Sequence, residues 1–235
     1  MSLLQAVVFD FDGVITDSEP RHLKAFQDVL GEIGWRLSAE DYYSRYLGFD
    51  DVGVFRAVAR DQRVPLDDAL LAALVGRKSA RYESLLRDGP SLFLGAADCV
   101  RRCARAVPLA VASGALRHEI ELILDAARLR DCFDVIVGAE DAGRSKPAPD
   151  PYLRALEELQ RARPDPDRRH ISASGTVAIE DSRWGIDSAH AAGLRCIAVP
   201  HTYRADELAT ADRVVANLEE LTVALLEDVC RTADT

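Results

Sequence analysis

Long apolar runs and basic charge are both scarce in this chain of 235 residues. No apolar run reaches the roughly 18 residues that a membrane-spanning helix needs. The N-terminus lacks a basic stretch and meets Asp10 early, so we expect no signal peptide and a cytoplasmic protein. The formal net charge of −10 disfavours binding to nucleic acid or to an anionic membrane surface.

Cysteine and lysine are also sparse. The five cysteines are odd in number and scattered through apolar segments. Cys99 and Cys103 lie four residues apart, but no second Cys or His pair completes a zinc site, so we expect reduced cysteines in the core. Lysine occurs only at Lys24, Lys78 and Lys146 among 29 basic residues, which makes each lysine a candidate for a specific role.

Short apolar runs rich in β-branched residues alternate with helical patterns over most of the chain. The runs lie at 6–9, 107–113, 134–138, 176–180, 196–200 and 213–216. Near-continuous apolar strands that alternate with helices are typical of a parallel sheet covered on both faces. We therefore predict an α/β fold with a Rossmann-like parallel sheet as its core.

The interval between about 18 and 90 interrupts this alternation, because it contains helical patterns and no convincing strand. One pattern ends at Gly34, Ser38 opens a second with a capping-box-like start, and 66–86 is a long amphipathic helix. Asp17 is predicted to cap the first helix, with steadying of the hinge as the alternative. We predict a catalytic core of residues 1–17 and 91–235, with 18–90 inserted as an α-helical cap domain. Two chain crossings suit a lid.

Polar residues stand where the predicted strands end. Asp10 and Asp12 are two apart, so their side chains point the same way. At an effective dielectric of about 20, like charges about 4 Å apart repel by roughly 4 kcal/mol. The remaining polar groups at strand ends are Ser113 with Gly114, Lys146, and Glu180 with Asp181.

Several acids at one sheet edge need a cation to stay ionised together. In open parallel sheets, ligands bind beyond the carboxyl ends of the strands, which is where these residues are expected to converge. Hard oxygen ligands in this number suit Mg²⁺, which commonly takes one or two carboxylates and keeps water or phosphate oxygens as its other ligands. The sequence therefore predicts a magnesium site.

These motifs, taken in order, resemble those of the haloacid dehalogenase superfamily over nearly the whole chain. The segment DFDGVITD at 10–17 is followed by Ser113, by Lys146 before a proline, and by the Glu180-Asp181 pair. The helical insert directly after the first motif resembles the subclass with an α-helical cap, which includes phosphoglycolate-type phosphatases and β-phosphoglucomutases.

The resemblance implies a catalytic role for each acid. Asp10 would be the nucleophile that forms an aspartyl-phosphate, and it would also touch Mg²⁺. Asp12 would protonate the leaving oxygen and later activate water, while its backbone carbonyl contributes to the metal site. Asp181 would bind the metal directly, and Glu180 directly or through water.

The resemblance also implies the substrate contacts. Ser113 and the amide of Gly114 would hydrogen-bond the phosphoryl oxygens, and Lys146 would pair with both Asp10 and the phosphate. In the helical insert, His22 matches a histidine that gates proton transfer in β-phosphoglucomutases, or it is simply a packed or exposed histidine. Gly48 matches a glycine of the cap loop.

Members of the superfamily with different activities carry different residues at a few positions, and three of these positions can be compared in this sequence. Dehalogenases lack the second aspartate of the first motif, and phosphonate-cleaving relatives replace it with a small residue, whereas Asp12 is present here. Phosphoglucomutases hold a second phosphate with a lysine and an arginine at the positions of Leu47 and Asp51. The neighbouring acids Asp50 and Asp51 would repel that phosphate unless Arg45 or Arg56 compensates.

We therefore predict a Mg²⁺-dependent phosphatase of small phosphorylated metabolites, such as a sugar phosphate or a phosphoglycolate-like compound. The cap loop at 46–51 is expected to select a small neutral or hydroxylated leaving group. The alternatives are a β-phosphoglucomutase-type mutase and, remotely, a non-catalytic phosphometabolite-binding protein. The sequence leaves open whether the protein is a monomer or a homodimer, and it does not identify the leaving group. It also leaves open the roles of Arg117, His118 and Arg204.

Overall fold

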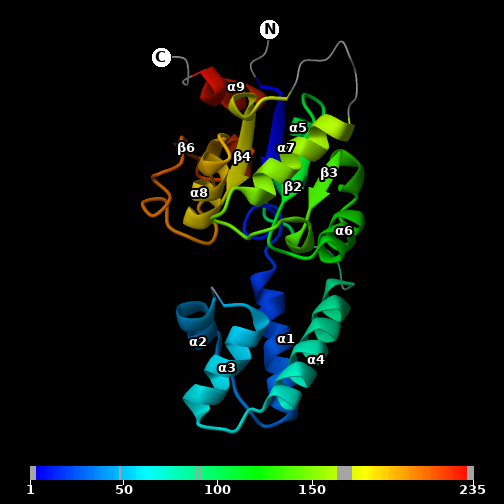
Figure 1. Cartoon of the computed structure of the whole chain (residues 1–235), viewed down its shortest axis with the longest axis vertical. Coiled ribbons are helices and arrows are strands. Elements are labelled where there is room, and N and C mark those ends of the chain that lie inside the picture. The colour runs from blue at the N-terminus through cyan, green and yellow to red at the C-terminus, as the bar shows by residue number, and fades with distance from the viewer. Residues whose placement is uncertain (1–3, 48, 88, 90, 163–170, 232–235) are drawn as a thin grey trace. The chain divides into compact units, whose positions relative to one another are not determined.

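The computed structural model describes residues 4–47, 49–87, 89, 91–162 and 171–231. Within them, six strands form one parallel sheet in the order β3-β2-β1-β4-β5-β6 (Figure 1). The strands are β1 (Ala6–Phe9), β2 (Leu109–Ala112), β3 (Val135–Val137), β4 (Thr176–Glu180), β5 (Arg195–Ala198) and β6 (Arg213–Val214). The predicted α/β fold with a Rossmann-like parallel sheet is confirmed.

The register of the sheet brings three strand ends level with one another. Val8 of β1 pairs with Ala110 of β2 on one side and with Ala178 of β4 on the other. Because all three strands run the same way, the residues after Phe9, Ala112 and Ile179 emerge at one edge. The sheet therefore places the polar residues of the first, second and fourth strands side by side.

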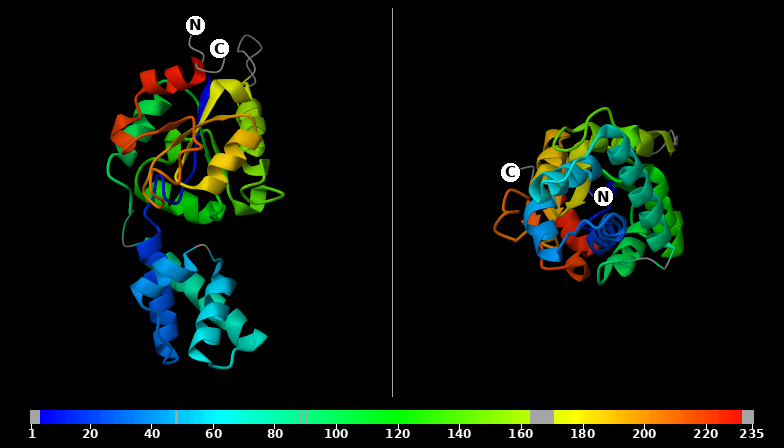
Figure 2. Two further views of the ribbon diagram at one scale, coloured as in Figure 1. Left: turned by 90° about the vertical axis from the view of Figure 1, so that its left-hand side faces the viewer. Right: turned by 90° about the horizontal axis from the view of Figure 1, so that it is seen from below.

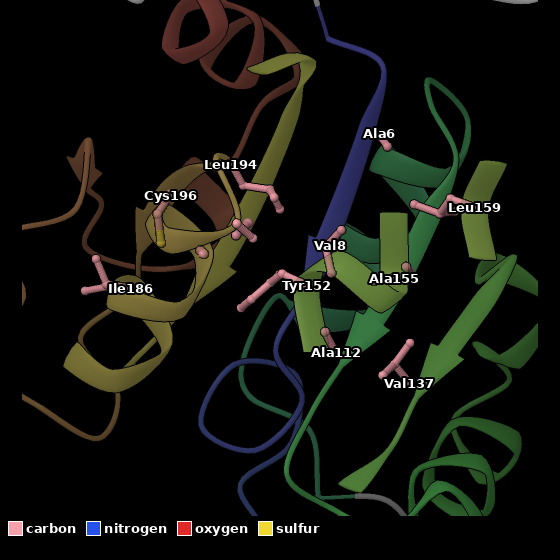
Figure 3. Close-up of a cluster of buried hydrophobic side chains, with 14 of the residues drawn as sticks. Ala6, Val8, Ala112, Val137, Tyr152, Ala155, Leu159, Ile186, Leu194 and Cys196 are labelled. Atoms are coloured by element: carbon pink, nitrogen blue, oxygen red, sulfur yellow. The ribbon is translucent and has the colours of Figure 1, made fainter. Parts of the chain in front are cut away.

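Helices cover both faces of this sheet. The helices of this part of the chain are α5 (Ala96–Ala104), α6 (Arg117–Ala126), α7 (Asp150–Ala162), α8 (Arg183–Ala191) and α9 (Val223–Arg231). Apolar side chains of α7 and α8 pack on strand residues of one face, among them Val8 and Ala112 (Figure 3). Helix α9 contacts β4 on the other face (Figure 2). Both faces are thus buried, which explains why the strands are apolar throughout.

The chain separates into two compact units, one of Met1–Asp17 with Pro90–Thr235 and one of Ser18–Gly89. The second unit is helical in its described residues. Its helices are α1 (Glu19–Glu32), α2 (Ala39–Asp41), α3 (Asp51–Gln62) and α4 (Asp68–Leu86), with a π-helical turn at Tyr42–Tyr46. Phe26, Phe55 and Leu74 lie at the centre of its own apolar core.

The two segments that join the units pair with each other inside the sheet-bearing unit. Thr16 forms a bridge with Leu92, and the Asp17 amide donates to the Ser91 carbonyl at 2.9 Å. Asp17 is thereby held in the linker, and the N-cap of α1 is Ser18, without a capping side chain. The prediction that Asp17 caps the first helix was therefore wrong, and its contact with Ser91 agrees with the alternative, a residue that steadies the linker.

The five cysteines are all free thiols. Cys99 and Cys103 are buried on α5 as expected, whereas Cys132 is half-buried and so only partly fits the prediction of core cysteines. The four buried cysteines need no further role, because a thiol is small and weakly polar and packs well in an apolar core.

The carboxylate of Asp212, just before β6, links β5 and α8 at one edge of the sheet by hydrogen bonds. Asp212 accepts hydrogen bonds from the Cys196 amide at 2.8 Å, from Arg195 at 3.0 Å and from His190 at 2.9 Å. Burial alone would raise the pKa of Asp212, but these donors outweigh burial and lower it. Since the folded pKa is below the unfolded one, ionised Asp212 stabilises the fold above about pH 4, the ordinary aspartate value.

We expect Asp212→Asn to lower the free energy of unfolding by about 1–3 kcal/mol at pH 7, because charged hydrogen bonds are lost. The difference from wild type should shrink as the pH falls below about 4, where the unfolded aspartate takes up its proton. Urea unfolding at both pH values measures this. Asp206→Asn is the matched control, because Asp206 is exposed in its pair with Arg204. An equal loss at both pH values would contradict the prediction.

Candidate active site

Lys146 links two carboxylates at the carboxyl edge of the sheet. Asp10 directly follows β1, and its amide donates to the Ile179 carbonyl at 2.9 Å, which anchors it beside β4. Lys146 Nζ donates to Asp10 Oδ1 and to Glu180 Oε1, both at 2.6 Å. All three side chains are largely buried. A buried cation shared by two acids offsets part of the repulsion between them.

Asp181 completes a group of three acids. One ligand oxygen each from Asp10, Glu180 and Asp181 lies within 4.8 Å of the others. The loop after β1 leaves room for Asp181 because Gly13 has no side chain, and a Cβ at Gly13 would lie 1.9 Å from Asp181 Oδ2. Gly13 also has a positive φ of 80°. Both its conformation and the close approach of Asp181 therefore require glycine here.

The pKa values of these acids reflect burial and crowding. Burial raises the pKa of Asp10 well above its ordinary value, Lys146 opposes this shift, and Glu180 and Asp181 add to it. Burial, followed by Glu180, raises the pKa of Asp181 to about 7. Burial by itself would lower the pKa of Lys146, but Asp10 and Glu180 raise it above its ordinary value. The lysine therefore stays charged.

Three other predicted residues of this unit lie near the same edge of the sheet. Ser113 follows β2 and is buried, and its Oγ accepts from the Ala115 amide at 3.0 Å. Gly114 is exposed in the turn after it. Asp12 stands at a bridge with Thr16, and its charge contributes to the raised pKa of Asp181. The Asp12 carboxylate does not belong to the three-acid group found among the described residues.

The remaining predicted residues belong to the helical unit. His22 lies on α1, stacked on Tyr82 with ring centroids 4.0 Å apart. Its Nδ1 lies 2.8 Å from Lys78 Nζ, and since lysine has only donors, Nδ1 is the acceptor. Burial and the charge of Lys78 lower the pKa of His22 to about 3, so the imidazole is neutral. Gly48 lies outside the described residues.

Lys78 carries the buried charge of the helical unit. Its side chain is 3% exposed, and Nζ donates to Asp51 Oδ1 at 2.6 Å. The cation that compensates Asp51 is therefore Lys78, rather than the Arg45 or Arg56 that the sequence suggested. Arg45 pairs instead with Asp61, and Arg56 with Asp68. The sequence did not indicate this pair because Lys78 lies 27 residues from Asp51 along the chain. The two meet because α4 brings Lys78 to the start of α3.

Two arginines left open by the sequence are engaged with their neighbours. Arg117, at the start of α6, pairs with Asp141 at 2.7 Å, and Arg204 pairs with Asp206 at 3.0 Å. Neither contact involves the three acids.

Sequence reasoning missed three residues that contact the site. Tyr152 Oη donates to Glu180 Oε1 at 2.7 Å. Thr202 hydrogen-bonds Asp181, which lowers its pKa, and His201 Nδ1 lies 2.9 Å from the Gly13 carbonyl. Tyr152 has the pattern of a core aromatic on an amphipathic helix, and the other two lie in a loop without a motif. Only their contacts distinguish them.

Comparison with known proteins assigns the family. The family model for haloacid dehalogenase-like hydrolases matches residues 4–193. The chain belongs to the haloacid dehalogenase-like hydrolases. It is 32% identical over 225 residues to Protein CbbY of Rhodobacter capsulatus, covering 92% of this chain and 94% of the relative. The resemblance that the motifs indicated is thereby confirmed.

Other members of the family extend the comparison. Hexitol phosphatase B of Escherichia coli (strain K12) is 31% identical over 221 residues, covering 92% of this hydrolase and 94% of the relative. A crystal structure of a CbbY variant from Rhodobacter sphaeroides in complex with xylulose-(1,5)bisphosphate superposes with a TM-score of 0.79 and 30% identity. It covers 95% of this hydrolase and 99% of that chain.

The fold of this hydrolase is thus shared with relatives over almost its entire length, and phosphatases are among them. Within the described residues, no helix is both long and apolar enough to cross a membrane.

Proposed function

We propose that this hydrolase is a Mg²⁺-dependent phosphomonoesterase of a small phosphorylated sugar or polyol, acting through an aspartyl-phosphate on Asp10. The observation that carries the proposal is the position of Lys146 between Asp10 and Glu180 beside Asp181. One lysine and three acids at the carboxyl edge of a parallel sheet leave this site negatively charged, so it suits an anionic phosphate ester once a divalent cation is bound beside the lysine.

The donor set fits a hard divalent cation. Three carboxylates offer ligand oxygens within 4.8 Å of one another, and raised pKa values of Asp10 and Asp181 indicate that nearby positive charge is insufficient. Asp10 and Asp181 would hold Mg²⁺, with Glu180 direct or through water and the Asp12 carbonyl as a further ligand. When bound, Mg²⁺ supplies positive charge against the phosphoryl oxygens.

The residues divide the displacement into two steps. The Asp10 carboxylate attacks phosphorus and the bond to the ester oxygen breaks, while Asp12 gives its proton to the leaving alkoxide. Asp12 then removes a proton from water, the water oxygen attacks phosphorus, and the bond to Asp10 breaks to release phosphate. Ser113, the Gly114 amide and Lys146 donate hydrogen bonds to the phosphoryl oxygens as charge develops.

Phosphate release from a panel of phosphomonoesters, with and without Mg²⁺, tests this function. The panel includes hexitol phosphates, fructose 1-phosphate, phosphoglycolate and xylulose 1,5-bisphosphate. We expect Mg²⁺-dependent release, with the best substrate naming the leaving group. Isomerisation of a sugar 1-phosphate with a bisphosphate activator and little free phosphate would favour the mutase, and binding without turnover would favour a non-catalytic protein.

The charge of the helical unit favours a monophosphate substrate. The buried Lys78 ammonium is paired with Asp51, so the pair has no net charge with which to attract a second phosphate. Asp50 is occupied differently, because it caps α3 by accepting from the Gly53 amide at 2.7 Å. We propose that the segment at 46–51 selects a neutral, hydroxylated leaving group.

Asp51→Asn is therefore expected to raise the ratio of kcat/KM for a bisphosphate to that for its monophosphate by about tenfold, the effect of about 1.4 kcal/mol. Removing the Asp51 charge leaves the Lys78 charge uncompensated. Steady-state kinetics with both substrates measures the ratio.

Asp50→Asn is the matched control, since it removes the same charge one residue away and asparagine still caps the helix. The selectivity proposal is wrong if Asp51→Asn leaves the substrate profile unchanged, or if Asp50→Asn changes it equally.

A further inference from the structure

Tyr152 is the largest side chain that is completely buried among the described residues, with an exposed fraction of 0%. It lies in the first turn of α7 and belongs, with Val8 and Ala112, to the buried cluster of Figure 3. A phenylalanine would fill the same volume. A buried hydroxyl without a partner would cost about 1–3 kcal/mol, so tyrosine is favoured at this position only if the hydroxyl has an acceptor.

The acceptor is Glu180. Tyr152 Oη donates to Glu180 Oε1 at 2.7 Å, the same oxygen that accepts from Lys146 Nζ at 2.6 Å. The other oxygen, Oε2, accepts from the Asp181 amide and from Ser182 Oγ, each at 3.2 Å. Glu180 is itself 0% exposed. Its carboxylate is therefore held from two sides, and Tyr152 supplies the shortest contact from a neutral group.

The space around this carboxylate is equally restricted. A Cβ at Gly185 would lie 1.9 Å from the Glu180 carboxyl carbon, so the start of α8 contacts the group closely. The Tyr152 ring also lies near the cation, because Lys146 Nζ is 5.0 Å from the ring centroid. Tyr152 thus contacts both partners of the ion pair, the acid through its hydroxyl and the lysine through its ring.

We infer that Tyr152 is a positioning residue of the active site. Its hydroxyl fixes the orientation of Glu180, and Glu180 in turn keeps Lys146 shared with Asp10 rather than paired with Asp10 alone. A Glu180 free to turn would alter both the acid group that suits Mg²⁺ and the charge beside the Asp10 carboxylate. This inference rests on the proposed phosphatase function for its kinetic consequence, but not for its structural one.

Tyr152→Phe tests the inference, because it removes the hydroxyl and keeps the ring. Partners of metal-binding acids typically contribute about 10- to 100-fold to metal affinity or activity. We expect the calorimetric Kd for Mg²⁺ to rise by about tenfold and kcat at saturating Mg²⁺ to fall by about tenfold, with KM for substrate within about twofold. In a Glu180→Gln background, the same substitution should leave the Mg²⁺ Kd unchanged.

Thr176→Val is the matched control. Thr176 is buried at the first residue of β4, at the far end of the strand that carries Glu180, and its hydroxyl donates to the Ser172 carbonyl at 2.8 Å. This variant also loses one buried hydrogen bond but should keep the Mg²⁺ affinity and kcat of the wild type.

A Tyr152→Phe protein that binds Mg²⁺ as tightly as Thr176→Val would overturn the inference, as would a wild type that binds no Mg²⁺. If the wild type binds Mg²⁺ but releases no phosphate from any ester, the proposed function fails by itself. The calorimetric comparison then still decides the role of Tyr152.

Discussion

Asp10→Asn is expected to reduce phosphate release by at least about 10⁴-fold, the scale seen when a catalytic nucleophile is removed. Asparagine has nearly the same shape and its amide oxygen still accepts from Lys146, but it cannot attack phosphorus. The protein should remain folded, because the substitution removes one of three crowded acids that Lys146 only partly compensates. Phosphate release under saturating Mg²⁺ and substrate measures the loss.

A second measurement tests the covalent step directly. Brief mixing with a ³²P-labelled substrate followed by acid quenching should leave label on the wild-type protein and none on Asp10→Asn. Asp212→Asn is the matched control, since Asp212 lies just before β6 and its hydrogen bonds go to His190, Arg195 and Cys196 rather than to the three acids. Residual activity of Asp10→Asn above about 1% of wild type would exclude Asp10 as the nucleophile.

Lys146→Met is expected to lower both activity and stability. Loss of one charged donor to a developing oxyanion typically costs about 10²- to 10³-fold in kcat. Breaking a buried ion pair from one side typically costs about 3–5 kcal/mol, because the remaining charge has no partner. Here two acids, Asp10 and Glu180, would lose their shared cation. Phosphate-release kinetics and urea unfolding of the metal-free protein measure the two effects.

The scarcity of lysine provides the control for this prediction. Lys24 also donates to a carboxylate at 2.6 Å, that of Asp28, but its side chain is 54% exposed. Lys24→Met should therefore change stability by less than about 1 kcal/mol and leave kcat unchanged. If Lys146→Met unfolds at the same urea concentration as Lys24→Met, the buried ion pairs contribute no net stability and the stability prediction is wrong. The predicted loss of kcat would then be the one remaining effect of Lys146.

The strands could be predicted because a strand buried on both faces has a nearly continuous run of apolar residues. The runs at 6–9 and 176–180 coincide with β1 and β4, the central strands from which Asp10 and Glu180 project. The run at 107–113 is longer than β2 at Leu109–Ala112, because Ser113 already lies in a turn, where its Oγ accepts a hydrogen bond from the Ala115 amide. Two predictions failed, the cap of the first helix by Asp17 and the arginine partner of Asp51. In both cases the residue instead contacts a residue far along the chain, Ser91 for Asp17 and Lys78 for Asp51.

By itself, the sequence determined the type of sheet and the edge at which its acids meet. Alternation along a strand and the shared direction of parallel strands are local rules, and they suffice to bring Asp10 and Asp181 together. Only the tertiary structure revealed the pairs that the motifs do not indicate. Lys146 also bonds Glu180, 34 residues away, and Tyr152 bonds Glu180 across 28 residues. Such pairs depend on which polar groups are desolvated together, and that is a property of the packed core rather than of any segment.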